Sequence, residues 1–398
     1  MNILVLNSGS SSLKCQYFID QKSVASLIVE RIGEEKGYSK IDYQKQSFSR
    51  TTPVSNHLQA LETIFSLLKE SGVMHSVDDL DAIGHRVVHG GSDFSEPTLV
   101  TQAVIETIRS LIPLAPLHNP ANLKGIEVIS KAHPNLPQVA VFDTAFHQTI
   151  PDHAALYPIP YDLYQKSGIR RYGFHGTSHA YVAKEAADMM GRDLNKLNLI
   201  TLHLGNGASA CAIKAGKSID TSMGLTPLEG LMMGTRSGDI DPAIIPFLSH
   251  NHEMDIDAID KMLNKESGLK GICGTNDMRE VIIQAEEEDT LSSLALEMYT
   301  YRIKKYIGSY SAVLGRVDAI VFTGGIGEHA VKVRDMVCEG LEESIGLKLD
   351  TVKNEIASTQ NRSIHKGESK IQLFIIPTNE ELEIVLQAEK TIKNMITN

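Results

Sequence analysis

A strand–turn–strand unit occurs twice in this chain of 398 residues, and it constrains the fold more than any other feature. Residues 3–6 (ILVL) form the apolar run of a buried strand, a polar Gly-containing turn follows, and a returning strand begins at Leu13. Residues 199–213 (LITLHLGNGASACAI) repeat this design, with Asn206 at a place comparable to that of Asn7. The duplication predicts an α/β chain built from two related halves around a cleft.

The length is sufficient for two domains of ordinary size, each with its own core. We expect one domain over residues 1–150, completed by a C-terminal helix over 382–398, and a second domain over 151–381. Residues 151–174 are rich in proline and tyrosine and indicate the junction.

The net charge and the cysteines limit the classes of partner. A formal charge of −11 argues against a nucleic-acid surface, which normally appears as a basic patch. The four cysteines contain no CxxC pair, which fits reduced thiols and gives no zinc or disulfide framework. The N-terminus lacks the basic region of a signal peptide, and no apolar run is long enough to span a membrane. We therefore expect a cytoplasmic protein with no nucleic-acid or membrane partner.

Residues 220–242 (DTSMGLTPLEGLMMGTRSGDIDP) show neither a helical nor a period-two apolar pattern. Their one cation, Arg236, stands among four acids, and their leucines and methionines argue against disorder. The stretch predicts an ordered loop that presents a guanidinium to an anion. The alternative is a surface loop with an incidental arginine.

The first polar turn is a candidate phosphate site. The hydroxyls of Ser10 and Ser12, the backbone N–H groups and the neighbouring Lys14 could hold phosphate oxygens. A purely structural Ser/Gly hairpin is the alternative interpretation.

Arg86 lies in the segment HRVVHGG, at the end of a strand expected over residues 81–88. On a helix, the spacing of His85 and His89 would suggest a metal site, but the β-branched residues and following glycines favour a strand or loop. A second acidic candidate, Asp143, follows the apolar strand within QVAVFDTAFH, in the usual place for a site in an α/β protein.

Two histidines are expected just before helix N-termini. Asn119 as N-cap and Pro120 at the first helical position place His118 outside a helix. In GFHGTSH, a cap at residue 177 or 178 places His175 before the next helix. Both positions suit an anion contact better than a two-histidine metal pair.

Three other motifs compete for the function. The Gly216-Lys217-Ser218 triplet is not a P-loop, since Cys211 occupies the required glycine position, and no GxSxG motif of a hydrolase is present. The stretch Gly325–Ala330 reads G-x-G-x-x-A after a strand, with Asp350 downstream, which is typical of a dinucleotide-binding dehydrogenase. The same Gly-rich turn can equally receive the sugar and α-phosphate of ATP.

Taken together, these segments resemble the acetate kinase family over nearly the whole length. The matching segments, in order, are LNSGSSSLK, GHRVVHGG, PLHNP, FDTAFH, GFHGTSH, HLGNGAS, the 220–242 loop, FTGGIGE and TNEEL. The resemblance implies two duplicated domains of the actin, Hsp70 and sugar-kinase (RNase H-like) type, an interdomain catalytic cleft and a homodimer. It also implies reversible phosphoryl transfer between ATP with acetate and ADP with acetyl phosphate, with Mg²⁺ or, in its place, Mn²⁺.

The resemblance assigns roles to individual positions. The catalytic residues are Arg86, Asp143, His175 and Arg236. The substrate-binding residues are Arg86, Val88, Leu117, His118, Phe174 and Pro227. The nucleotide-binding residues are Ser10, Ser12, Lys14, His203, Leu204, Gly205, Asn206, Gly207, Asp277, Met278, Arg279, Gly325, Ile326, Gly327, Glu328 and His329. The metal positions are Asn7 and Glu380. One position departs from the family pattern, because His329 stands where asparagine is usual.

Acetate is ionised at neutral pH and needs no general base, so we expect Asp143 to orient an arginine or Mg²⁺. Val88 is expected to limit the depth of the pocket and favour acetate, although one methylene discriminates by only about 1–3 kcal/mol. Three alternatives remain open, which are a propionate or broader short-chain acyl kinase of the same family, the dehydrogenase, and a non-catalytic nucleotide sensor.

Overall fold

The computed structural model describes residues 1–116 and 118–397, and these form two compact units. Unit 1 comprises Met1–Phe146 and Asn379–Asn398, and unit 2 comprises His147–Thr378. Within the described residues, no helix has the length and apolar character needed to cross a membrane.

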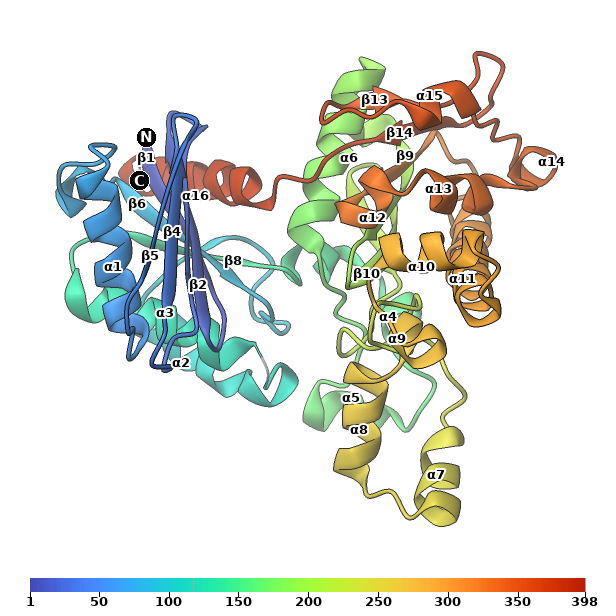
Figure 1. Ribbon diagram of the computed structural model, residues 1–398, viewed down its shortest axis with the longest axis horizontal. Helices are drawn as coiled ribbons and strands as arrows, with labels where there is room; N and C mark the ends of the chain where they lie inside the picture. Colours follow the sequence, from blue (N-terminus) through green and yellow to red (C-terminus); the bar gives the residue numbers. More distant parts are fainter. Residues whose placement is uncertain (117, 398) are drawn as a thin grey trace. The chain divides into compact units, whose positions relative to one another are not determined.

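Unit 1 is built on one mixed sheet of eight strands in the order β5-β4-β3-β2-β1-β6-β8-β7 (Figure 1). The strands are β1 (Asn2–Ser8), β2 (Ser12–Ile19), β3 (Lys22–Glu30), β4 (Tyr38–Tyr43), β5 (Gln46–Thr51), β6 (Ala82–Val87), β7 (Thr98–Leu99) and β8 (Gln138–Phe142). The helices are α1 (His57–Glu70), α2 (Gln102–Ser110), α3 (Asn119–Ala132) and α16 (Glu380–Thr397).

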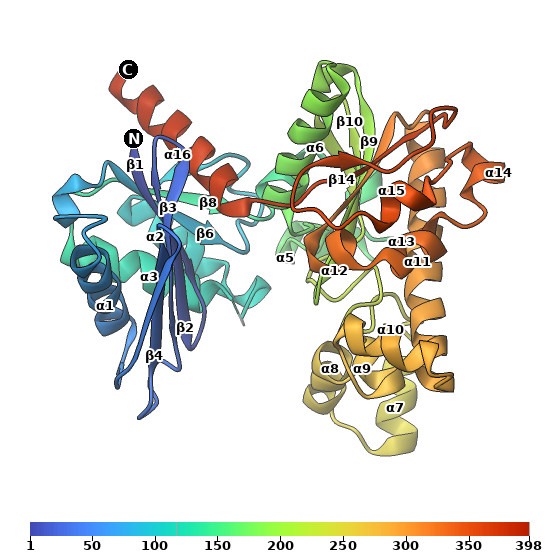
Figure 2. The same ribbon diagram turned by 45° about the horizontal axis from the view of Figure 1, so that its top comes forward.

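Both faces of the unit 1 sheet carry apolar side chains. On one face, Leu4, Leu6 and Tyr17 belong to a buried cluster with Leu61 and Ile64 of α1. On the other face, the side chains of β1 and β6 pack against the apolar side of α16, which also contacts β8 and β7 (Figure 2). The alternation of buried side chains along β2 follows from the period of two in a strand.

Unit 2 contains a six-stranded sheet in the order β11-β10-β9-β12-β14-β13. The strands are β9 (Asn198–Leu204), β10 (Ala208–Lys214), β11 (Lys217–Thr221), β12 (Ala319–Thr323), β13 (Arg362–Ser363) and β14 (Gln372–Ile375). The helices are α4 (Asp152–Ala155), α5 (Tyr161–Ser167), α6 (Gly176–Met190), α7 (Ile244–His252), α8 (Ile256–Lys265), α9 (Gly268–Cys273), α10 (Met278–Glu286), α11 (Thr290–Leu314), α12 (Gly324–His329), α13 (Val331–Cys338), α14 (Leu341–Ile345) and α15 (Thr351–Glu355).

The two sheets confirm the predicted duplication. In unit 1, β3, β2 and β1 are antiparallel neighbours, and β6 and β8 continue the sheet in parallel with β1. In unit 2, β11, β10 and β9 are antiparallel, and β12 and β14 continue in parallel with β9. This shared order differs from the all-parallel sheet that the dehydrogenase alternative requires.

The placement of the two asparagines in the repeat is corrected. The first turn begins at Gly9 after β1, and the second begins at Gly205 after β9. Asn7 lies within β1 opposite Lys14, whereas Asn206 lies in the middle of its turn. In the repeated units, Asn7 therefore corresponds to His203 and not to Asn206.

Two predicted helix caps are also corrected. The residue at the N-cap of α3 is His118, and Asn119 is the first helical residue. Helix α6 begins at Gly176, with His175 as its N-cap in a left-handed conformation (φ 56°), so neither Thr177 nor Ser178 caps it. His175 does precede its helix, as predicted.

Candidate active site

The carboxyl ends of three parallel strands, β1, β6 and β8, meet at one edge of the unit 1 sheet. Asn7 lies near the end of β1, Arg86 near the end of β6, and Asp143 directly after β8. Lys14 is opposite Asn7 on β2. The edge therefore brings together four side chains that the sequence predicted for the site.

Arg86 is held by two carboxylates. Its Nη2 donates to Asp143 Oδ2 at 2.7 Å, its Nε lies 3.1 Å from each Asp143 oxygen, and Glu380 Oε2 is 3.5 Å from Nη2. The Asp143 side chain is buried, while that of Arg86 is 24% exposed. Burial acts to lower the pKa of Arg86, but the attraction of Asp143 and Glu380 outweighs it and raises the pKa. The guanidinium is thus fixed in charge and orientation.

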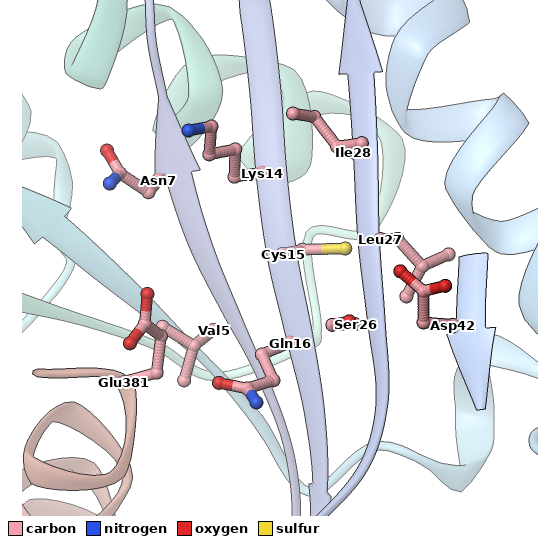
Figure 3. A pocket seen from close by; sticks show the side chains of 10 residues that line it. All are labelled: Val5, Asn7, Lys14, Cys15, Gln16, Ser26, Leu27, Ile28, Asp42 and Glu381. Carbon is pink, nitrogen blue, oxygen red and sulfur yellow. The ribbon is translucent and has the colours of Figure 1, made fainter. Parts of the chain in front are cut away.

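A hollow of about 400 Å³ lies on the unit 1 sheet, beside the strands that carry Asn7 and Lys14 (Figure 3). Asn7 and Lys14 extend into it from neighbouring strands, and Glu381 reaches it from the first turn of α16 (Figure 3). In the adjoining turn, Gly9 N donates to Ser12 O at 2.8 Å, and Ser10 is exposed. The lining thus combines an amide oxygen, an ammonium group and a carboxylate.

Two buried asparagines fasten the end of β6, a role that no local sequence pattern indicates. Asn119 accepts from His89 N at 3.1 Å and donates to His89 O at 3.0 Å. Asn122 accepts from Val88 N at 3.1 Å and donates to Ser8 O at 2.9 Å. Tertiary hydrogen bonds, and not helix capping, account for Asn119.

The predicted acyl-pocket residues fall in both units. Val88 and His118 are half-buried residues of unit 1, at the end of β6 and at the start of α3. Phe174, which is buried, and Pro227 belong to unit 2. Leu117 lies outside the described residues.

The second candidate region lies at the carboxyl ends of β9 and β12 in unit 2. A hollow of about 920 Å³ is lined there by residues of three predicted nucleotide segments. The predicted lining residues are Gly205, Asn206, Asp277, Met278, Arg279, Gly325, Ile326 and His329. The other lining residues, which were not among the predicted nucleotide-binding residues, are Asn276, Ile282, Ile283, Glu286, Ala330, Val331, Lys332 and Asp335.

Six of these additional lining residues lie on α10 and α13, and Asn276 and Ala330 lie just before those helices. A local sequence pattern predicts a helix, but it does not show that these two helices lie beside one hollow. Ile283 is 55% exposed, so apolar surface is available to a planar ligand. Asp277 caps α10 by accepting from Arg279 N at 2.9 Å, and the hydrogen bond from the Arg279 side chain lowers the pKa of Asp277 to about 2.

Of the predicted nucleotide residues in unit 2, five are absent from the lining of this hollow. Leu204 is fully buried, and Gly327 accepts a hydrogen bond from the buried Arg334. Glu328 Oε1 accepts from Thr378 N at 3.3 Å. The remaining two residues are His203, whose ring stacks on that of His175, and Gly207, which lies close to Arg236 and His175.

Arg236 and His175 converge on Gly207. A Cβ atom on this glycine would lie 3.5 Å from Arg236 Nη1 and 3.6 Å from His175 Nε2. Arg236 is half-buried and donates to Pro227 O at 3.2 Å, and burial lowers its pKa. Among the described residues, no carboxylate lies within ion-pair distance of this guanidinium. A partly desolvated cation beside an imidazole is an arrangement that favours an anionic ligand.

The imidazole of His175 is held on two sides. Its Nδ1 is 2.9 Å from Ser209 Oγ, and its ring stacks on that of His203 with centroids 4.1 Å apart. Ser178, which the sequence suggested as a cap, instead bonds His203 Nδ1 and Thr378 Oγ1, each at 2.8 Å.

The loop carrying Arg236 is anchored by residues that no sequence motif indicates. Arg171 Nη1 donates to Thr221 O at 2.7 Å, and its Nη2 donates to Glu229 Oε1 at 2.7 Å. Tyr157 donates to Glu229 Oε2 and accepts from Leu225 N at 2.9 Å. The Pro/Tyr-rich segment lies in unit 2, and its Tyr157 and Arg171 side chains clamp the loop.

A duplicated sheet of this order, with glycine turns and cations at its strand ends, defines a kinase of the actin and sugar-kinase fold. Residues 2–386 match the model of the acetokinase family, and the chain belongs to this family. The dehydrogenase interpretation of Gly325–Ala330 is therefore wrong. Asp350, its expected ribose acid, instead caps α15 through Lys353 N at 3.1 Å.

Three similar proteins support this membership at full length. The acetate kinase of Sulfurovum sp. (strain NBC37-1) is 64% identical over 395 residues, which cover 99% of this chain and 100% of that protein. The crystal structure of Porphyromonas gingivalis acetate kinase has a TM-score of 0.94 and 43% identity, covering 98% of this chain and 99% of that one. The crystal structure of a propionate kinase from Francisella tularensis subsp. tularensis SCHU S4 has a TM-score of 0.91 and 44% identity, with the same coverage.

Proposed function

We propose that this protein is an acetate kinase that transfers the γ-phosphoryl group of ATP directly and reversibly to acetate. The observation that carries the proposal is Arg236, a half-buried guanidinium that converges with His175 on Gly207 without a carboxylate partner among the described residues. A purely structural arginine in a loop would be expected to have its charge neutralised.

The chemistry requires cations more than a base. A carboxylate oxygen of acetate attacks the γ-phosphorus, the bond from that phosphorus to the bridging oxygen breaks, and ADP leaves with the electron pair. Two like unit charges 4 Å apart repel by about 4 kcal/mol at an effective dielectric constant of 20. Fixed positive groups around an in-line transfer therefore supply the catalysis.

We assign the acetate carboxylate to Arg86, whose orientation is set by Asp143 and Glu380. Asp143 orients this arginine and does not act as a base, because acetate is already ionised at neutral pH. Arg236 and His175 stabilise the transferring phosphoryl group.

The hollow of unit 2 is our candidate for the nucleotide site. Exposed Ile283 offers apolar surface to the base, and Asn206, in the turn that follows β9, offers its backbone N–H group to a phosphate. His329, which replaces the family's usual asparagine, also lines this hollow with a 68% exposed side chain. A slight change in nucleotide preference is its expected effect.

Asn7 and Glu380 fit the requirements of Mg²⁺. Glu380 Oε2 is buried and, apart from its ion pair with Arg86 at 3.5 Å, has no hydrogen-bond partner, and Asn7 offers an amide oxygen at the same sheet edge. Within the described part of the chain, no group of three or more His, Cys, Asp or Glu side chains could hold a metal ion. Mg²⁺ typically uses one or two protein oxygens together with substrate phosphates, which fits so sparse a set. When bound, Mg²⁺ or Mn²⁺ would neutralise phosphate charge.

Three further assignments belong to this proposal. The family resemblance suggests a homodimer, which light scattering can test. The four free thiols fit a reducing compartment, and we propose a cytoplasmic location. The functional domains are proposed as residues 1–150 with 382–398, which hold the first hairpin and acetate site, and residues 151–381, which hold the nucleotide site.

A hydroxylamine trap tests the reaction directly. The protein is incubated with ATP, Mg²⁺, hydroxylamine and acetate, propionate or butyrate, and acyl hydroxamate is measured. We expect the fastest product from acetate and a loss of roughly 10³–10⁵ in kcat for Arg236→Ala. Arg192→Ala is the matched control, because Arg192 lies in the same unit with a 42% exposed side chain that pairs with Asp318. Absence of product with every acid would favour a non-catalytic nucleotide sensor.

A propionate kinase is the second candidate. The Francisella tularensis propionate kinase is 44% identical to this chain, about as similar as the Porphyromonas gingivalis acetate kinase at 43%. Overall similarity to these two structures therefore does not separate the two acids. A faster hydroxamate signal from propionate would favour propionate kinase while leaving the mechanism unchanged.

A further inference from the structure

A chain of hydrogen bonds leads from His175 into the interior of unit 2. His175 Nδ1 is 2.9 Å from Ser209 Oγ, Ser209 Oγ is 2.8 Å from His179 Nε2, and His179 Nδ1 is 2.7 Å from Thr201 Oγ1. Ser209, His179 and Thr201 are fully buried. These three residues are called the relay below.

Thr201 determines the direction of the relay. Within the described residues, the hydroxyl of Thr201 has no hydrogen-bond partner apart from His179 Nδ1. If it accepted from His179, its own hydrogen would be buried without an acceptor, whereas as a donor it leaves only oxygen lone pairs unused. Thr201 therefore donates to His179 Nδ1.

The remaining hydrogens follow in order. Burial lowers the pKa of His179 well below its ordinary value, so the ring is neutral and carries one hydrogen. With Nδ1 accepting, that hydrogen is on Nε2 and is donated to Ser209 Oγ. The Ser209 hydroxyl then donates to His175 Nδ1.

We propose that Ser209 and His179 are positioning residues that hold His175 in the tautomer with its hydrogen on Nε2. This atom lies on the side of Gly207 that Arg236 also approaches. A hydrogen there can be donated to a phosphoryl oxygen, while the opposite tautomer would present a lone pair to it and repel it. The catalytic meaning of the tautomer rests on the proposed function, but the tautomer itself does not.

Nitrogen NMR of the substrate-free protein tests the assignment. Histidine is labelled with ¹⁵N, the His175 signals are assigned with His175→Asn, and spectra are recorded at pH 8, above the ordinary histidine pKa of about 6.5. We expect a protonated Nε2 and an unprotonated Nδ1 in the wild type. In Ser209→Ala, the two tautomers should be mixed. A wild-type hydrogen on Nδ1, or unchanged signals in Ser209→Ala, would overturn the proposal.

Thr201→Val separates positioning from general stability. The substitution removes a buried hydroxyl from the same relay. His179 should still carry its hydrogen on Nε2 and donate it to Ser209, because a hydrogen on Nδ1 would be buried against a methyl group of the new valine. We therefore expect the His175 tautomer to persist in Thr201→Val while the melting temperature falls. Equal mixing in Thr201→Val and Ser209→Ala would indicate loosened packing and contradict the positioning role.

Kinetics provide the second readout. Ser209→Ala should lower kcat roughly threefold to tenfold with little change in either KM, the scale of one neutral hydrogen bond. His179→Gln, which keeps a donor toward Ser209, should retain more kcat than His179→Leu. If His179→Gln and His179→Leu have the same kcat, the relay is contradicted. If the wild type forms no acyl phosphate but shows the expected tautomer, the proposed function fails and the hydrogen-bond assignment stands.

Discussion

Arg86 and Asp143 face each other across the ends of β6 and β8, and the guanidinium reaches both carboxylate oxygens through Nε and Nη2. Arg86 retains a 24% exposed side chain, while the Asp143 side chain is only 2% exposed. A two-point contact of this kind fixes the plane of the guanidinium as well as its position. The buried carboxylate of Asp143 therefore sets the orientation of the more exposed Arg86 side chain.

Asp143→Asn should disturb the orientation of Arg86 without removing its charge. An amide offers one oxygen, and its NH₂ group would oppose the donors of Arg86. We expect kcat/KM for acetate to fall by roughly 10²-fold, the scale of a small misplacement of a binding group. The shape of the pH–rate profile should be unchanged, because no base is removed.

Steady-state kinetics across pH check this prediction, with Glu127→Gln as the control. Glu127 forms an exposed ion pair with Arg109 in the same unit, at 2.6 Å. Near wild-type activity in Asp143→Asn would exclude an essential role for the carboxylate. Loss of one limb of the pH profile would instead identify a general base.

Tyr157→Phe should loosen the loop that carries Arg236. The substitution leaves Leu225 N and Glu229 Oε2 without the phenol that now bonds both. A buried group that loses its partner costs about 1–3 kcal/mol, so the free energy of unfolding should fall by that order. We also expect a lower kcat.

Urea denaturation and initial rates measure both effects. Tyr161→Phe is the matched control, since Tyr161 is 59% exposed on α5 in the same unit. If Tyr157→Phe lowers stability but leaves kcat at the control value, the clamp serves folding alone.

The positions of Asp143 and Asp277 could be predicted because their sequence signals are local. Asp143 directly follows an apolar run, and Asp277 precedes a helix that it caps, so neighbouring residues were enough. The clamp of Arg171 on Glu229 joins positions 58 residues apart, and neither residue stands in a pattern that announces the other.

The predicted starts of α3 and α6 were wrong because tertiary hydrogen bonds compete with helix capping. Ser178 has the side chain of a good N-cap, but its hydroxyl bonds Thr378, 200 residues away, and His203. Asn119 likewise uses its amide on His89. Such partners exist only once the sheet has formed, so capping preference alone misplaced both helix starts.

Three buried histidines predict an acid-sensitive fold. Burial lowers the pKa of His85, His89 and His147 to about 4 each. Because the folded-state pKa lies below the ordinary value, the unfolded chain binds more protons between about pH 6.5 and 4. Stability is therefore fully present above this window and falls as pH decreases through it.

Urea denaturation from pH 8 to pH 4 measures this dependence. A fully buried histidine with this shift contributes on the order of 3 kcal/mol across the window. His85→Gln keeps an amide near Gln138. It should reduce the slope of the free energy of unfolding against pH by up to the contribution of one bound proton. An unchanged slope would mean that His85 does not remain neutral in the fold.

Val88→Ala should shift the preference from acetate toward propionate. The backbone of Val88 is fastened by Asn122, so the substitution removes two methyl groups without releasing the end of β6. Space for one methylene is worth about 1–3 kcal/mol, so the ratio of kcat/KM for propionate to that for acetate should rise by roughly tenfold or more. The hydroxylamine trap with both acids measures this ratio, and Val77→Ala, at a half-buried valine away from the site, should leave it unchanged. An equal ratio in both variants would place the specificity of the acyl pocket in residues other than Val88.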